Sequence, residues 1–315
     1  YAMLLRKWLL EQVRLDVEIV PRKSQFVPTH DIDHLFRFKG YWQAFKSIVG
    51  RDLLINRNVE EVKRSFEEFN ICRKNKGEDP YVQAIYELVR QSETHGLKSI
   101  FFFKALRAWE PDCTYNVDDP IVRSCMEMIL SKGIQVGYHA GYDSYDDEAC
   151  FQTEKKRLET ILGQSVACSR QHYLRFSLQP DLGGFFPGNE RLQQIRKERA
   201  NTVQVWQNSA IAHDYTLGFA EQPGFRCGTC HPYPLYDLNN DCPTNVVEHP
   251  LIVMDGSLFD YQKLNVEQSN ALIDRLRERC EAVEGDFVIL WHNHLLSRDY
   301  RDAYRKIYLH QLELV

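Results

Sequence analysis

Apolar and polar positions along the chain predict helices and strands in turn. Residues 3–15 predict a helix, because Leu5, Trp8, Leu9 and Val13 recur at helical spacing. Short apolar runs bounded by turn residues predict strands that are buried on both faces. The first of these runs ends at Pro28, and the others cover 98–103, 134–138, 165–168, 250–254 and 287–291. The alternation favours an α/β fold with a mostly parallel sheet.

Capping signals place several of the helices. Asp118 or Asp119 can cap a helix that has Pro120 at its first position and ends near Gly133. Further helices are predicted at 41–50, 59–75, 80–95, 146–163, 188–200, 265–283 and 299–312. The three helices in 41–95 form an outer layer or an insertion. The 203–213 region predicts one more strand, which leads to His213 and Asp214.

The first cluster of candidate chemistry is Thr29-His30-Asp31-Ile32-Asp33-His34, directly after an apolar, extended run. In an extended backbone Asp31 and Asp33 project to the same side. Two neighbouring carboxylates stay ionised only with a cation between them; otherwise one has a raised pKa. The segment therefore predicts a metal site or a proton-transfer site. An Asp-rich turn that caps the next helix is the alternative.

Polar residues also follow the later strands. His139 ends one strand, Asp143 lies four residues further on, and Arg170 and His172 follow the next strand. Parallel strands place such residues at one edge, where α/β folds bind ligands. Carboxylate and imidazole ligands hold a divalent cation that acidifies water. A structural ion pair is the alternative for Arg170 and His172. Asp214, Asp255 and His292 complete the set of strand-end residues.

Length and charge limit the function classes. With 315 residues and 43% hydrophobic content, the chain is long enough for one barrel-sized domain or two smaller ones. The net charge is −5 with Lys and Arg interspersed among Asp and Glu, which argues against binding nucleic acid or anionic membranes. No apolar run is long enough to span a bilayer. Oligomeric state cannot be inferred from the sequence.

Cysteine usage and the first residue bear on location. Nine scattered cysteines favour reduced thiols in a cytosol over a disulfide framework. The chain begins at Tyr1, so a further N-terminal domain can precede it. A Cys-x-x-Cys pair at Cys227 and Cys230 is a weak metal signal, because a zinc knuckle needs two such pairs.

The order Thr-x-Asp-x-Asp, Gly-x-His, Arg-Gln-His, Gly-Phe-Arg-x-Gly-Thr-Cys and Trp-His-Asn resembles the polysaccharide deacetylases, the NodB-homology or carbohydrate esterase family 4 group. The resemblance spans about residues 25–295. It implies a single catalytic domain over residues 1–315, with the fold of a distorted (β/α)7 barrel with extra helices. It also implies a metal-dependent hydrolase that removes N-acetyl groups from an amino sugar of a bacterial polysaccharide or its precursor. The partner would be an N-acetylated carbohydrate, and the cofactor a divalent ion, zinc first, with nickel, cobalt or manganese as alternatives.

The resemblance also implies roles for single residues. Asp31 matches the general base, Asp33 and His139 match metal ligands, Arg170 matches the arginine that orients the base, and His292 matches the general acid. Candidate substrate contacts are Tyr142, Tyr173, Arg226 and Trp291. For Trp291 and the aromatic residues around Tyr142, packing in the core is the alternative and the commoner role of a single aromatic side chain.

One position departs from the family pattern, which commonly has a second histidine where this chain has Asp143. The third metal ligand is therefore Asp143 or His172. Two other functions remain open, a related hydrolase for a small cyclic or linear amide, and a catalytically inactive carbohydrate-binding member.

Overall fold

The computed structural model describes residues 22–50, 59–105, 113, 115–178, 200–297 and 301–315. Nine strands form one sheet in the order β6-β7-β5-β4-β3-β2-β1-β9-β8. All neighbouring strands run parallel except β6 and β7. The strands are β1 (Phe26–Ile32), β2 (Ile100–Phe103), β3 (Gln135–Ala140), β4 (Cys168–Gln171), β5 (His213–Asp214), β6 (Tyr233–Asp237), β7 (Cys242–Glu248), β8 (Leu251–Met254) and β9 (Phe287–Leu290).

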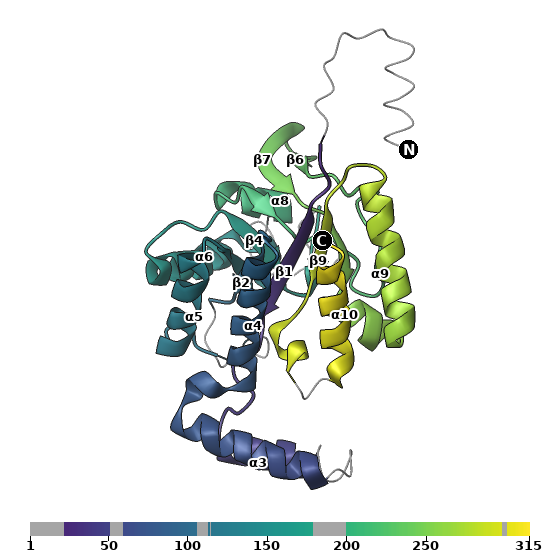
Figure 1. Ribbon diagram of the computed structural model, residues 1–315. Helices are drawn as coiled ribbons and strands as arrows, with labels where there is room; N and C mark the ends of the chain where they lie inside the picture. Colours follow the sequence, from purple (N-terminus) through teal and green to yellow (C-terminus); the bar gives the residue numbers. More distant parts are fainter. Residues whose placement is uncertain (1–21, 51–58, 106–112, 114, 179–199, 298–300) are drawn as a thin grey trace, which may run out of the picture.

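Helices cover the outer face of this sheet, with α4, α5 and α6 on one flank of β1 and α9 and α10 on the other (Figure 1). The helices are α2 (Tyr41–Ser47), α3 (Val59–Lys74), α4 (Pro80–Thr94), α5 (Pro120–Ser131), α6 (Glu148–Leu162), α8 (Thr202–Asn208), α9 (Val266–Glu281) and α10 (Arg301–Glu313). The helices expected at 3–15 and 188–200 lie outside the described residues, Ala200 excepted. Within the described ranges, no helix is long and apolar enough to span a membrane.

The sheet curls until alternate side chains of distant strands meet on its inner face. Phe102, Cys168, Leu251 and Leu290 belong to one buried cluster, although they come from β2, β4, β8 and β9. The segment that follows β5 bridges the opening toward β8, since Leu251 N donates to Leu217 O at 3.2 Å. The result is a curled, mostly parallel half-barrel, which confirms the expected distorted barrel.

Local signals explain where the elements begin. The Asp119 side chain accepts a hydrogen bond from Ile121 N at 3.0 Å, and Pro120 occupies the first turn of α5, as predicted. Gly163 ends α6 with φ of 67°, a left-handed conformation that glycine adopts at little cost.

The strand expected in the 203–213 region is confined to its end, His213 and Asp214, because 202–208 form the helix α8. Asn201 caps this helix by accepting from Gln204 N at 2.8 Å. Val203 and Val205 alternate as in a strand, but both are buried in a helix beside Trp206. Tertiary packing has overridden the local pattern. The hairpin of β6 and β7 was not predicted, since its proline-rich start is typical of a loop.

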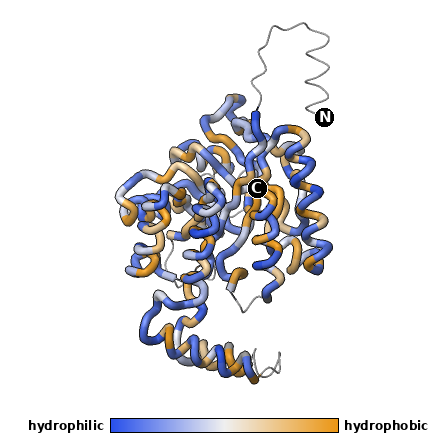
Figure 2. The backbone as a smooth tube through the Cα atoms, in the orientation of Figure 1, coloured by the Kyte–Doolittle hydropathy of each residue, from blue (hydrophilic) through white to orange (hydrophobic). Residues whose placement is uncertain are grey.

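Helices α2 and α3 form an arm beyond the C-terminal end of β1 (Figure 1). Its small apolar cluster contains Ala44, Ile48 and Phe69 and is separate from the main core. Figure 2 shows hydrophilic and hydrophobic residues mixed along α3, as expected of a helix that buries one face. Asp79 fastens the arm to α4, because its carboxyl accepts hydrogen bonds from Arg37 N at 2.9 Å and from Tyr81 N at 3.0 Å.

The inner face tolerates no added side chain at Gly137. A Cβ atom there would lie 2.5 Å from the Phe102 ring and 3.1 Å from Cys168 Sγ. We expect Gly137→Ala to lower the free energy of unfolding by about 1–3 kcal/mol in urea denaturation, because overpacking forces the neighbours apart. Gly40→Ala is the control, since open space surrounds that position. Equal stability of the two variants would contradict the inner-face packing.

Burial raises the pKa of Asp79 to about 6, although the amides of Arg37, Tyr81 and Phe38 favour its ionised form. The folded carboxyl then takes up a proton near pH 6, whereas the unfolded one stays ionised to about pH 4. Relative to Asp79→Asn, we expect the wild type to gain about 1 kcal/mol of stability from pH 7 to pH 5. Parallel stability curves for the two proteins over this range would contradict the shift.

Candidate active site

Side chains at the C-terminal ends of the strands meet because they point to the same side of the sheet as the apolar side chains of its inner face. Along β1, Val27 packs in the inner cluster, and Asp31 and Asp33 follow it at even spacing, so both lie toward the same side. Along β2, β3, β4 and β9, polar residues likewise follow the inner-face residues at even spacing. The polar residues that point to the inner side in this way are Thr29, Asp31, Asp33, Lys104, His139, Arg170, His172 and His292.

One imidazole contacts both carboxylates that the sequence placed on one wall. His139 Nε2 lies 3.5 Å from Asp31 Oδ2 and 3.2 Å from Asp33 Oδ1. His172 Nε2 lies 3.6 Å from the same Asp33 oxygen. Ligand atoms of Asp33, His139 and His172 all lie within 4.8 Å of one another. A divalent ion with bonds of about 2.0–2.2 Å to oxygen and nitrogen spans such separations.

A hydrogen bond to one ring nitrogen of His139 determines which nitrogen is left to bind a metal. Its Nδ1 lies 2.9 Å from the Arg170 carbonyl oxygen, which can only accept, so Nδ1 carries the proton. Nε2 makes no hydrogen bond within the described part of the chain. Metal binding would use the deprotonated Nε2, and the two carboxylates beside it supply the negative charge that a cation requires. The three residues therefore fit a divalent cation.

Arg170 orients and ionises Asp31. Its Nη1 lies 3.0 Å from Asp31 Oδ1 and donates to Thr29 Oγ1 at 2.8 Å, and its Nε donates to the Tyr215 carbonyl at 2.9 Å. Burial alone would raise the pKa of Asp31, but Arg170, followed by His139 and His292, lowers it below the usual value. Asp31 is thus a fixed, ionised carboxylate that can accept a proton.

His292 has the opposite character. Its Nδ1 donates to Asp255 Oδ1 at 2.8 Å, and its backbone N donates to Asp255 Oδ2 at 2.6 Å. Its Nε2 lies 3.4 Å from Asp33 Oδ2. Burial would lower the pKa of His292, but Asp255 and then Asp33 raise it well above the usual value. His292 is therefore a protonated imidazole that can donate a proton.

Two features of this centre were not predicted from the sequence, the pairing of Asp255 with His292 and the burial of Lys104. Asp255 was recognised at the end of a strand, but its pairing with His292 depends on β8 lying beside β9. Lys104 is fully buried, and its Nζ lies 3.6 Å from Asp33 Oδ1. Its signal was its place directly after the apolar strand β2. Burial alone would raise the pKa of Asp33, but His139, His172 and His292, and then Lys104, hold it well below the usual value.

The structure does not bring Asp143 into the cluster. Its side chain is 84% exposed, and it lies 3.5 Å from Arg175 Nη1. The loop after His139 does not make the helical turn that would have stacked the two residues, and Asp143 stands outside the short 3-10 turn Ser144–Asp146. His172 lies on the inner side instead, one residue beyond β4.

The four candidate substrate contacts separate into two kinds. Tyr142 and Tyr173 are 41% and 63% exposed, and their rings lie 5.5 Å apart at the rim. Trp291 is fully buried and packs on Tyr308, so it cannot stack on a sugar. It follows Leu290 and therefore points away from the inner face. Arg226 donates to the carbonyls of Leu174 and Gly218 and so ties two loops together.

Comparison with known proteins identifies the fold. No protein-family profile and no curated protein matches the sequence. A crystal structure of a candidate polysaccharide deacetylase from Mycobacterium smegmatis aligns with a TM-score of 0.54 and 14% identity over 94% of this chain and 86% of that one. The chain therefore has the NodB-homology fold of the polysaccharide deacetylases.

Two more distant structures were also found. A candidate polysaccharide deacetylase from Pseudomonas aeruginosa PAO1 has 13% identity and a TM-score of 0.44, over 73% of this chain and 66% of that one. A carbohydrate esterase family 4 pseudoenzyme from Bacillus anthracis has 10% identity and a TM-score of 0.40, over 93% of this chain and 62% of that one.

The placement of Asp143 and His172 predicts which one binds metal. After metal removal and equilibrium dialysis against zinc, we expect His172→Gln to bind at least about tenfold more weakly than the wild type, because it loses a nitrogen donor. Asp143→Asn should bind as the wild type does. Weak binding in Asp143→Asn with full binding in His172→Gln would contradict this geometry.

Proposed function

We propose that the protein is a metal-dependent hydrolase that removes N-acetyl groups from an amino sugar of a bacterial polysaccharide or its precursor. The observation that carries the proposal is the placement of Asp31, paired with Arg170, and of His292, paired with Asp255, around one three-donor cluster. Amide hydrolysis needs a base that activates water and an acid that protonates the leaving amine. The polysaccharide deacetylase fold supports the choice of an N-acetyl sugar.

Asp33, His139 and His172 would hold the divalent ion, for which zinc is our first choice and nickel, cobalt and manganese are the alternatives. When bound, the ion lowers the pKa of water and polarises the acetyl carbonyl group. A four-coordinate ion held by these two imidazoles and one carboxylate would keep one position for water or substrate, as catalytic sites require.

The proton transfers follow from the fixed geometry of the chain. Asp31 takes a proton from the attacking water, while the Arg170 guanidinium, 3.0 Å away, keeps the carboxylate in place. His292 then gives its Nε2 proton to the departing amine, while Asp255 holds the ring through Nδ1. Water attack adds an oxygen to the acetyl carbon, and the C–N bond breaks as the nitrogen is protonated. Acetate and a free amino sugar result.

The rim supplies substrate contacts. Tyr142 and Tyr173 are exposed, the Tyr173 ring lies 4.2 Å from that of His172, and the Arg175 guanidinium carbon lies 3.9 Å from the Tyr142 ring centre. Tyr173 has a φ of 56°, an uncommon conformation for a residue with a side chain, which directs its backbone differently from the preceding strand. We propose that both tyrosines contact the sugar.

Acetate release from N-acetylglucosamine oligosaccharides tests the proposal. We expect turnover by zinc-loaded protein and a fall in kcat of about 10²–10⁴-fold in Asp31→Asn, which removes the base. Asp255→Asn should move the alkaline limb of the pH profile to lower pH, because it removes the anion that raises the pKa of His292. Asp143→Asn is the control and should keep its activity.

Other outcomes would assign another function. Hydrolysis of small cyclic or linear amides without acetate release from sugars would identify the related C–N hydrolase. Saccharide binding without turnover of either substrate, by protein that holds its metal, would identify a non-catalytic carbohydrate-binding protein.

A further inference from the structure

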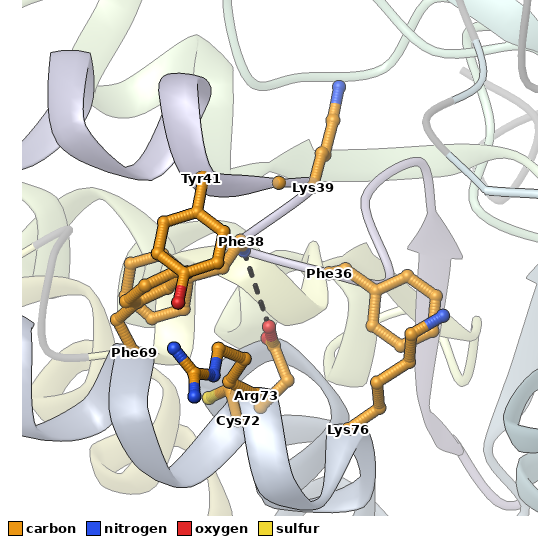
Figure 3. A pocket seen from close by; sticks show the side chains of 10 residues that line it. Phe36, Phe38, Lys39, Tyr41, Phe69, Cys72, Arg73 and Lys76 are labelled. Atoms are coloured by element: carbon orange, nitrogen blue, oxygen red, sulfur yellow. Dashed lines mark hydrogen bonds between the residues drawn. The ribbon is translucent and has the colours of Figure 1, made fainter.

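A second recess lies outside the candidate active site, between the segment that follows β1 and helix α3 of the arm (Figure 3). Its empty space, which includes volume open to solvent, is about 550 Å³. Its walls combine aromatic rings with cationic side chains. The residues that give it this character are Phe36, Lys39, Tyr41, Phe69, Arg73 and Lys76. We call it the arm pocket.

Two cations of the arm pocket stand beside aromatic faces. The Arg73 guanidinium carbon lies 5.4 Å from the Tyr41 ring centre, and Lys76 Nζ lies 5.4 Å from the Phe36 ring centre. Figure 3 shows the two pairs: Arg73 of α3 with Tyr41 at the start of α2, and Lys76, two residues beyond α3, with Phe36 of the segment after β1. The Lys76 side chain is 65% exposed and Tyr41 is 59% exposed, so both remain accessible to a ligand. Such pairs preorganise a positive charge next to a flat apolar surface.

The charge of the arm favours an anion. Residues 36–76 contain ten Lys and Arg against five Asp and Glu, a net charge of +5 in a chain of −5, so the remainder carries −10. Asp79 also lines the pocket, but its carboxyl accepts hydrogen bonds from the backbone of Arg37, Phe38 and Tyr81. Lys76 also lies 3.6 Å from Asp119 Oδ2. Cationic side chains still exceed carboxylates along the wall.

The arm pocket lies at the same sheet edge as the candidate active site. Phe36 follows Asp33 by three residues, and the arm stands beyond the C-terminal end of β1 (Figure 1). Asn293, the neighbour of His292, donates to the His34 carbonyl at 2.8 Å and to the Tyr81 carbonyl at 3.1 Å. The loop that carries the proposed acid is thereby bonded to the segments that flank the pocket.

We propose that the arm pocket binds an anionic saccharide unit, with its pyranose face on the Tyr41 and Phe36 rings and its carboxylate or phosphate on Arg73 and Lys76. The planar guanidinium matches both anions through two parallel N–H donors, and the ammonium adds a point charge. Combined with the proposed function, on which this step rests, the substrate is an acidic glycan or a sugar phosphate, and the unit in the pocket neighbours the one that is deacetylated.

Calorimetry with three saccharides tests the pocket directly. The probes are a hyaluronan tetrasaccharide, which carries carboxylates, UDP-N-acetylglucosamine, which carries phosphates, and neutral chitotetraose. We expect the wild type to bind one of the two anionic probes at least tenfold more tightly than chitotetraose. Which anion binds more tightly distinguishes a uronate from a phosphate. Added salt should weaken the binding of the anionic probe and leave the binding of chitotetraose unchanged.

Matched variants locate the effect. Arg73→Gln with Lys76→Gln should remove the preference for the anionic probe. Lys63→Gln with Lys74→Gln should keep it, since this pair removes the same charge from exposed positions of α3 outside the pocket. Unchanged thermal unfolding of both doubles would show that neither loses the fold. Equal loss in the two doubles, or equal affinity of the wild type for neutral and anionic probes, would overturn the proposal.

Two further outcomes separate saccharide binding in the arm pocket from membrane binding and from catalysis. Binding to phosphatidylglycerol vesicles with no affinity for any saccharide would overturn the proposal and assign the arm to a bilayer surface. Calorimetry needs no turnover, so the anionic preference should persist in Asp31→Asn. An anionic preference in a protein that releases no acetate from any probe would contradict the proposed function and support the pocket.

Discussion

The candidate site depends on keeping two buried carboxylates ionised within reach of one imidazole. Asp31 and Asp33 are 3% and 9% exposed, and burial by itself favours the neutral form of each. Arg170 offsets this at Asp31, whereas three histidines and Lys104 offset it at Asp33. These opposing groups come from several different strand ends. The order of strands in the sheet therefore sets the protonation states on which the chemistry depends.

A layer of hydrogen bonds beneath the site holds Arg170 in place. The Tyr215 carbonyl that accepts from Arg170 Nε belongs to the segment after β5. Asp214 holds this segment, because its carboxyl accepts from Thr216 N at 2.8 Å and from Ser169 Oγ at 2.5 Å. Burial raises the pKa of Asp214 to about 6, although these hydrogen bonds oppose the shift. Hydrogen bonds therefore connect this layer to Asp31 through Arg170.

Most helices and strands, and much of the cluster around Asp31 and Asp33, could be predicted from the sequence, because side-chain alternation along a strand and helix capping are local properties. Asp119 and Pro120 start α5, and Asp31 and Asp33 lie to one side as extended residues must. The same alternation places Trp291 on the outer face, away from any sugar in the site.

Pairings that depend on the tertiary structure could not be found in this way. Lys104 follows an apolar strand and is typical of a solvent-exposed loop, yet the curled sheet buries it. The choice between Asp143 and His172 depended on the path of one loop, and the bond between Asp255 and His292 depended on strand pairing.

The X-ray absorption spectrum of zinc-loaded protein at the zinc edge tests the central claim most directly. Asp33, His139 and His172 predict a shell of nitrogen and oxygen at about 2.0–2.1 Å with the multiple-scattering signature of imidazole. That signature should weaken in His172→Gln. A sulfur shell at about 2.3 Å, as Cys227 and Cys230 would give, or no zinc uptake at all, would contradict the account.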